Sequence, residues 1–242
     1  YKSPVDNGVY AVKQDGRLIP LSKADYQCIS VAIVHDDHKI MIEKNEDSNQ
    51  SYKTATSGLP DSSNKTYSFY WGEYGTDQTG ITNYDKVDGS NDFGFLKPEQ
   101  DSYKGTPYLP DDVSSWTNGA LSDWDGKANS NVLKGVTTGG GSYTSYATAG
   151  HVLNTFLASA DAKGYDDWYI PSCGQLSLIY MYLISVNNAL LAIGGQPLDT
   201  RYYWSSSEHS SNSGWIVLFN NGRTFTRYKR LTSSVRFVRD IE

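Results

Sequence analysis

The sequence predicts a single α+β domain in which short antiparallel strands begin and end the chain and two helices lie between them. Short β-branched runs bounded by turn residues fill positions 8–42, and similar runs return after position 201. Between 152 and 183 the apolar residues instead recur at helical spacing. Strands, then a helical region, then strands again is an α+β order. We assign residues 1–242 to one domain, because β-rich folds often reach this length as one unit.

The first strands are predicted from hairpin signals. The runs Gly8–Val12 and Leu18–Ile19 flank an Asp15-Gly16 turn, and Asp-Gly between apolar runs is a strong hairpin signal. The runs Ile29–Val34 and Lys39–Ile42 are short and β-branched, so we predict buried strands there.

Residues 51–147 are interpreted as a loop-rich insertion. Periodicity disappears there, and Gly, Ser, Asp, Asn, Tyr and Trp dominate. A structureless loop of that length is uncommon in a compact domain. We therefore expect short strands and ordered loops pinned by Trp71, Trp116 and Trp124.

Two helices are predicted after the insertion. The first is expected to end at Gly164, and its apolar face consists of Val152, Leu153, Phe156, Leu157 and Ala160. The second begins after Pro171, where Ser172 and Gln175 have the spacing of a capping box. Its apolar stripe consists of Leu176, Ile179, Tyr180 and Leu183. A break is expected near Asn187-Asn188, and the helical region ends between Gly194 and Pro197.

The last strands are predicted at 202–205, 215–219, 223–229 and 235–238, with a turn at Asn220-Asn221-Gly222. Alternation places Trp215, Val217 and Phe219 on one face, which we expect to be core, and Ile216, Leu218 and Asn220 on the other. The second face is expected to be open beside Arg223, Phe225, Arg227 and Tyr228. Aliphatic, aromatic and Arg side chains together are typical of binding hot spots. The alternative is a strand that is buried on both sides.

Composition favours recognition over chemistry. Aromatic residues make up 13% of the chain, including 19 Tyr, and such side chains give large contact areas at low entropic cost. The formal net charge of −6 argues against a general nucleic-acid binder. Residues 201–242 nevertheless carry seven Lys or Arg and three acidic residues, so they are locally basic. No run of 18 apolar residues occurs, so we predict no membrane span.

No metal, cofactor or catalytic group is predicted. His35-x-x-His38 is interpreted as a solvated hairpin tip, and Asp85-x-x-Asp88-Gly89-x-x-Asp92 and Asp123-x-Asp125-Gly126 lack the spacing of a calcium loop. No nucleophile is tied to His151. Gly139-Gly140-Gly141 neither follows a strand nor opens a helix, so it is interpreted as a flexible turn rather than a phosphate loop. Cys28 and Cys173 can form one disulfide or none, and buried free thiols are the preferred interpretation.

Several long segments carry a resemblance to a known family. They are GVYAVKQDGRLI at 8–19, HKIMIEK at 38–44, WGEYGT at 71–76, GYDDWYIPSCGQLSLIY at 164–180, YYWSSSEHSSNSGW at 202–215, FNNGR at 219–223 and VRFVRDI at 235–241. With these segments the chain resembles the variable proteins of diversity-generating retroelements and related bacterial lectin-like domains. The resemblance implies a C-type-lectin-like fold, with two helices packed on short antiparallel sheets. In such folds the terminal strands meet, so we expect Val9–Val12 and Val235–Val238 to share one sheet system.

The resemblance also implies a division of residues 201–242 into a constant frame and a diversifiable ligand-binding surface. The frame would consist of Trp204, Glu208, Trp215, Phe219, Gly222, Lys229, Arg236 and Arg239. The ligand-binding residues would be Tyr202, His209, Ser211, Ile216, Leu218, Asn220, Arg223, Phe225, Arg227, Tyr228 and Arg230. The implied function is a non-enzymatic adhesin or receptor-binding module for a protein or carbohydrate on another cell or host surface. It would be displayed outside the cell, on its surface or on a phage tail.

Two related activities are considered beside this function. Calcium-dependent sugar lectins of this fold show Glu-Pro-Asn or Gln-Pro-Asp followed by Trp-Asn-Asp, whereas this chain has Gln196-Pro197-Leu198, and Ile216 follows Trp215. That difference argues against calcium-mediated sugar binding. The alternative function is an enzyme of the formylglycine-generating type, which needs a reactive cysteine pair, and Cys28 and Cys173 lie outside any such signature.

Overall fold

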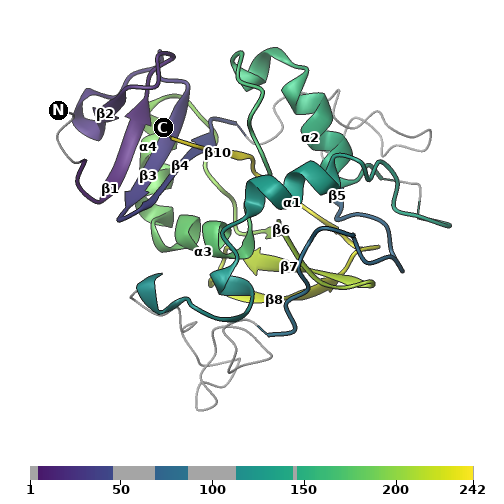
Figure 1. Ribbon diagram of the computed structural model, residues 1–242. Coiled ribbons are helices and arrows are strands. Elements are labelled where there is room, and N and C mark those ends of the chain that lie inside the picture. The colour runs from purple at the N-terminus through teal and green to yellow at the C-terminus, as the bar shows by residue number, and fades with distance from the viewer. Residues whose placement is uncertain (1–4, 46–68, 87–112, 144–145, 242) are drawn as a thin grey trace.

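The computed structural model describes residues 5–45, 69–86, 113–143 and 146–241, and it has the α+β class that the sequence predicts. Within these ranges the regular structure consists of three antiparallel sheets and four α-helices (Figure 1). The remaining parts of the predicted insertion lie outside the described residues, and so do Asp88 and Asp92 of the first Asp-rich motif.

The largest sheet joins the two ends of the described chain (Figure 1). Its strand order is β10-β4-β3-β1-β2, and every neighbouring pair is antiparallel. The strands are β1 (Gly8–Val12), β2 (Leu18–Pro20), β3 (Ser30–His35), β4 (His38–Glu43) and β10 (Val238–Asp240). Both predicted hairpins are therefore confirmed. The prediction that the terminal strands share one sheet is also confirmed, although the last strand begins at Val238 rather than Val235.

The smaller sheets carry the C-terminal residues. One has the order β6-β7-β8 and consists of β6 (Tyr202–Ser210), β7 (Ser213–Leu218) and β8 (Arg223–Tyr228). The other pairs β5 (Phe69–Tyr70) with β9 (Thr232–Ser233). Phe69 and Tyr70 of the predicted insertion thus pair with the C-terminal region, which agrees with the expectation of short strands in the insertion.

The helices differ from the prediction in number and in where they end. They are α1 (Gly126–Leu133), α2 (Ala149–Leu157), α3 (Cys173–Met181) and α4 (Leu183–Ala192). Helix α1 lies in the segment predicted to be loops. The sequence did not predict this helix, because GKANSNVL is too polar to show an apolar stripe. Helix α2 ends at Leu157, before the predicted stop at Gly164, and a short 3-10 helix (Ala160–Ala162) fills the interval.

The capping box at Ser172 is confirmed, but the predicted helix break is misplaced. The Ser172 hydroxyl accepts a hydrogen bond from the Gln175 backbone amide, and the Gln175 side chain accepts one from the Ser172 backbone amide. Helices α3 and α4 bend by 76° at Tyr182, not near Asn187. Asn187 stays helical and pairs with both backbone groups of Leu198 at 3.0 and 2.8 Å, which holds the following loop. No single described helix is long and apolar enough to cross a membrane, although this bent pair meets the length and composition test.

Two core clusters flank the β6-β7-β8 sheet. Trp215, Val217 and Phe219 pack with α3, α4 and one face of the large sheet. Trp204, Ile216 and Val235 pack with α2 and with Trp71 of the insertion. Trp71 and Trp116 are buried and Trp124 is half-buried, so the expectation that tryptophans pin the insertion holds for the described residues.

Candidate ligand-binding face

Most of the predicted ligand-binding residues of the last hairpin share one face of the β6-β7-β8 sheet. Tyr202 lies opposite Leu218, and Leu218 lies opposite Arg223. Further along the hairpin, Ile216 lies opposite Phe225 and Gly214 opposite Arg227. Because side chains alternate along a strand, Leu218, Arg223, Phe225 and Arg227 all point to the side that Tyr202 occupies. The face assignment made from sequence alternation is therefore correct for Arg223, Phe225 and Arg227, whereas Tyr228 lies opposite Ser213 and belongs to the face of Trp215.

The prediction that this face is open at Ile216 is wrong. Ile216 has no exposed surface, and it packs in the core cluster that contains Trp71 and Trp204. The β5-β9 ladder and the segment that carries Trp71 cover this part of the sheet. The strand is thus buried on both sides at Ile216, which was the alternative interpretation. On the same face Leu218, near the β7-β8 turn, and Phe225 and Arg227 of β8 are half-buried, so the face is partly open there.

At this open end, two arginines and two aromatic rings form what we call the arginine–aromatic patch, which consists of Tyr202, Arg223, Phe225 and Arg227. The Arg223 guanidinium lies 5.3 Å from the centroid of Phe225, and that of Arg227 lies 4.8 Å from the centroid of Tyr202. The two rings meet edge to face at 5.8 Å. Such cation–π contacts hold the guanidinium planes in place without neutralising their charge.

The donors of the patch are largely unused. The Nε atoms of Arg223 and Arg227 are buried and make no hydrogen bond within the described structure, and Arg227 donates only from Nη2, to the Thr232 carbonyl at 3.2 Å. Among the described residues neither arginine forms an ion pair, whereas Arg201, Lys229 and Arg239 do. Buried unsatisfied donors are uncommon in proteins and often mark a place for an ion, a water or a ligand.

The turn below the patch is fixed by backbone geometry. Gly222 has φ +73°, and a Cβ there would lie 2.2 Å from the ring of Tyr180, so only glycine fits. The Gly222 amide donates to the Leu218 carbonyl at 2.8 Å, and the Arg223 amide donates to the Asn221 side chain at 3.1 Å. Asn220 is exposed at the tip. The predicted frame role of Gly222 thus has a clear steric basis.

A second group lies at the opposite end of the hairpin, and we call it the Arg230 cage. The Arg230 guanidinium lies 4.9 Å from the ring of Tyr74, 5.2 Å from that of Tyr228 and 5.8 Å from that of Tyr143. It also donates to the Tyr143 hydroxyl at 2.9 Å. Tyr228 is 51% exposed, so the cage is open to solvent.

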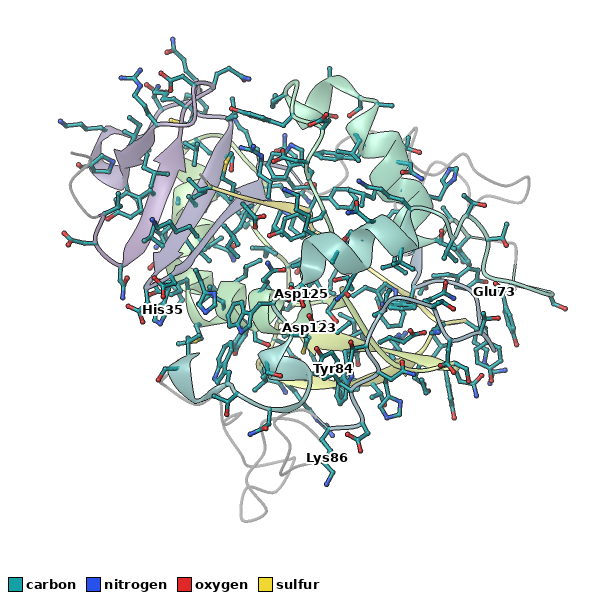
Figure 2. All side chains as sticks on the ribbon, viewed as in Figure 1. His35, Glu73, Tyr84, Lys86, Asp123 and Asp125 are labelled. Carbon is teal, nitrogen blue, oxygen red and sulfur yellow. The ribbon has the colours of Figure 1, made fainter. Side chains whose placement is uncertain are left out.

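Glycines bring the cage tyrosines together. The Tyr74 amide donates to the Gly139 carbonyl at 3.0 Å. A Cβ on Gly139 would lie 2.4 Å from the Tyr143 carbonyl, and one on Gly140 would lie 2.6 Å from the side chain of Glu73, which is labelled in Figure 2. The glycine run predicted to be a flexible turn is therefore a tight turn that places Tyr143. Sequence reasoning missed Tyr74 and Tyr143, because no spacing signal links the insertion to Arg230.

His209 and Ser211 lie near the cage at the β6-β7 turn. The Ser211 carbonyl accepts a hydrogen bond from Gly75 at 2.9 Å, and His209 packs edge to face on Trp215 at 5.7 Å. Burial lowers the pKa of His209. Both side chains are half-buried, so they border the surface rather than project from it.

The frame beneath both groups contains a fully buried ion pair. The ammonium of Lys229 donates to the carboxylate of Glu208 and, at 2.7 Å, to the Thr76 carbonyl, and neither side chain of the pair is exposed. The amide of Gln78 donates to both Glu208 oxygens at 3.1 Å. Burial raises the pKa of Glu208 and lowers that of Lys229, while their mutual contact favours both charged forms. The pair therefore ties the insertion to β6 and β8.

The other frame residues are also interior. Trp204, Trp215, Phe219 and Arg236 are all 2% exposed or less. The Arg236 guanidinium donates to the carbonyls of Glu43 and Gln196 at 2.9 and 2.7 Å, which links the C-terminal segment to β4 and to the loop after α4. Arg239 donates to both Asp167 oxygens, from Nε at 2.7 Å and from Nη2 at 2.9 Å.

The motifs considered for metal or redox chemistry lie elsewhere in the fold. Among the described residues there is no group of three or more His, Cys, Asp or Glu that could hold a metal ion. Asp123, labelled near the start of α1 in Figure 2, is buried and accepts hydrogen bonds from Ser207 and Asn129 at 2.5 and 2.9 Å. Cys28 and Cys173 are both buried free thiols, and burial raises the pKa of Cys173.

Comparisons with known proteins identify no family. No protein-family model matches the chain, and no curated protein matches it. One solved structure, a fimbrial protein from Bacteroides ovatus, is similar with a TM-score of 0.49 and 14% identity, over 98% of this chain and 49% of that one. The chain thus spans about half the length of that protein. Similarity at this level assigns no function.

Proposed function

We propose that the chain is a non-enzymatic binding module with C-type-lectin-like architecture, and that the β7-β8 end of its C-terminal sheet binds a ligand carrying anionic groups. The ligand would be a protein or glycan on another cell or host surface. The arginine–aromatic patch carries this proposal. It presents two guanidinium groups that have no described acidic partner and whose Nε donors are unused. Guanidinium is the side-chain group best matched to carboxylate, sulfate and phosphate, which it binds through two parallel hydrogen bonds.

The surrounding charges support an anionic ligand. The formal charge of the whole chain is −6, yet residues 201–242 carry an excess of basic residues. Lys229 and Arg236 of this set are buried, so the positive charge that an anion meets at this end of the sheet comes from Arg223 and Arg227, and on an acidic protein it attracts anions to that one place. Tyr202 is 38% exposed, so an aromatic ring is available beside the two cations.

The proposed cellular location depends on where the ligands of the module lie. A module that grips ligands on other surfaces would be displayed outside the cell, on its surface or on a phage tail. The resemblance to retroelement variable proteins adds the proposal that codons of the outward residues are diversified. A reverse-transcriptase gene and a near-copy of the 3′ end beside the coding sequence are the expected genomic observation. A neighbourhood with neither feature would contradict diversification but not binding.

The alternative, an enzyme of the formylglycine-generating type, requires an accessible reactive cysteine. Cys173 is fully buried, and burial raises the pKa of its thiol, which disfavours the nucleophilic thiolate. We therefore expect ligand affinity to survive the changes Cys28→Ser and Cys173→Ser in any variant that stays folded. Loss of a turnover activity in these variants would instead support the enzyme.

The direct test compares charged and neutral polymers of one backbone. We expect immobilised dextran sulfate to bind the protein and uncharged dextran not to bind it. The variant Arg223→Gln/Arg227→Gln should lose about tenfold or more in affinity, since hydrogen bonds to charged groups contribute about 1.5–3 kcal/mol each. The control Arg17→Gln/Lys23→Gln removes the same charge from exposed positions at the N-terminal end. Equal losses in both variants would show non-specific attraction and contradict the proposal.

A further inference from the structure

A pocket of about 380 Å³ lies away from the C-terminal hairpin, between the β3-β4 turn, the start of α1, helix α3 and the last strand. The side chains that matter for its chemistry are Asp37, His38, Trp124, Gln175 and Asp240. Its volume falls within the range of about 300–1,000 Å³ that is usual for small-molecule sites. The two sequence motifs that were not assigned to metal binding meet here, because His38 ends the first and Trp124 lies inside the second, between Asp123 and Asp125.

The aromatic wall of the pocket is rigid. The rings of His38 and Trp124 stack with centroids 3.6 Å apart, and Trp124 stacks in turn with buried Trp116 at 6.0 Å. Helix α3 approaches the indole closely, since a Cβ on Gly174 would lie 3.2 Å from Trp124 Cε2. Both stacked side chains line the pocket. Within the described structure, neither the His38 nitrogens nor the Trp124 Nε1 makes a hydrogen bond.

The acidic wall is held in position by a chain of hydrogen bonds. The Gln175 amide accepts from the backbone of Ser172 at 2.9 Å and donates to the Tyr169 hydroxyl at 2.9 Å. That hydroxyl donates to Asp240 Oδ1. Burial, reinforced by the charge of Asp240, raises the pKa of Tyr169, so it stays a donor. Asp240 is thereby fixed, and Lys127 Nζ lies 3.8 Å from its second oxygen.

The ligand class follows from these donors and acceptors. The lining residues carry an indole N–H donor, imidazole nitrogens, two carboxylates and the Lys39 ammonium around a hydrophobic stack, and this mixture suits hydroxyl groups that donate and accept at once. The carboxylates of Asp37 and Asp240 repel an anion. An ammonium ligand would meet Lys127 beside Asp240 and would leave the Trp124 N–H unpaired. A neutral polyhydroxyl ligand satisfies every group.

We propose that this pocket is a second binding site, for a neutral mono- or disaccharide, distinct from the arginine–aromatic patch. The sugar hydroxyls would donate to Asp37 and Asp240 and accept from Trp124 Nε1, while the sugar ring packs against His38. This site does not depend on the proposed function of the C-terminal face, since the two share no residue and take ligands of different charge.

The test observes the indole N–H signals of the 6 tryptophans in the full ¹⁵N-labelled chain. The signal of Trp124 is assigned with the variant Trp124→Phe. Glucose, galactose, mannose, N-acetylglucosamine, lactose and maltose are then titrated one at a time. We expect at least one of these sugars to shift the Trp124 signal saturably, while the signals of fully buried Trp204 and Trp215 stay unchanged.

Matched variants separate the site from its surroundings. The exposed carboxylate Asp37 has no hydrogen bond within the described structure, so Asp37→Asn should stay folded and weaken sugar binding by about tenfold. Asp36→Asn, one residue away and outside the pocket, should leave binding unchanged, as should Arg223→Gln/Arg227→Gln. No saturable shift with any sugar, equal effects of the two Asp variants, or a shift produced by methylammonium instead of sugars would overturn the proposal.

Discussion

Two sets of basic side chains in the C-terminal region show how partners decide the role of a residue. Lys229 and Arg236 are fully buried; Lys229 is held by Glu208 and backbone oxygen, and Arg236 by backbone carbonyls. Arg223 and Arg227 are half-buried, lie over aromatic rings and have unused Nε donors. The first set is held inside the fold by hydrogen bonds to backbone oxygen and to Glu208. The second set lies at the surface and has no ion-pair partner among the described residues.

The largest change in stability is expected from a variant of the first set. Lys229→Ala leaves the Glu208 charge buried without its partner, so we expect a loss of about 3–5 kcal/mol in the free energy of unfolding, measured with urea. The double variant Glu208→Leu/Lys229→Met should recover much of that loss, because it removes both charges together. A loss below about 1 kcal/mol for Lys229→Ala would show that the pair is not part of the frame.

The next prediction concerns the two faces of β7. Trp215→Ala should cost about 3–5 kcal/mol and Ile216→Ala about 2–5 kcal/mol, because both side chains are fully buried in separate cores. Leu218→Ala should cost less than Ile216→Ala, since Leu218 is half-buried. Urea unfolding of the three variants checks this order. A silent Ile216→Ala would restore the open face that the sequence predicted at that position.

A smaller effect is expected from pH. Burial, followed by the charge of His35, lowers the pKa of His38 below the ordinary value of about 6.5. The unfolded chain therefore binds a proton that the folded chain resists, so stability falls as pH drops from about 6.5 through the folded-state pKa. His38→Gln should reduce this fall, as measured by urea unfolding at pH 7 and pH 5. An unchanged slope would indicate that His38 titrates normally.

The smallest effect is expected from chelation. The described residues contain no cluster of metal ligands, and the Asp123 carboxylate is already occupied by Ser207 and Asn129. We predict that a chelator changes the melting temperature by no more than about 2 °C, because loss of a structural ion would remove binding energy directly from stability. A much larger decrease would reveal a metal in the Asp-rich loops.

Local patterns predicted the local structure well. The Asp15-Gly16 hairpin, the capping box at Ser172 and the alternation of β7 depend on neighbouring residues, so the sequence contains enough information for them. The burial of Ile216 instead depends on a distant segment, because Trp71, which packs in the same core cluster, comes from the insertion. Tyr74 and Tyr143 of the Arg230 cage were missed for the same reason.

The account is tested most directly by a change that keeps the charge of the patch but removes its planar geometry. Arg223→Lys/Arg227→Lys preserves net charge, yet ammonium cannot form the two parallel hydrogen bonds that guanidinium makes with an oxyanion. We predict that this variant loses about tenfold or more in affinity for dextran sulfate, while its free energy of unfolding stays within about 1 kcal/mol of wild type. Unchanged affinity in the Lys variant would contradict recognition by the arginines and leave only general electrostatic attraction.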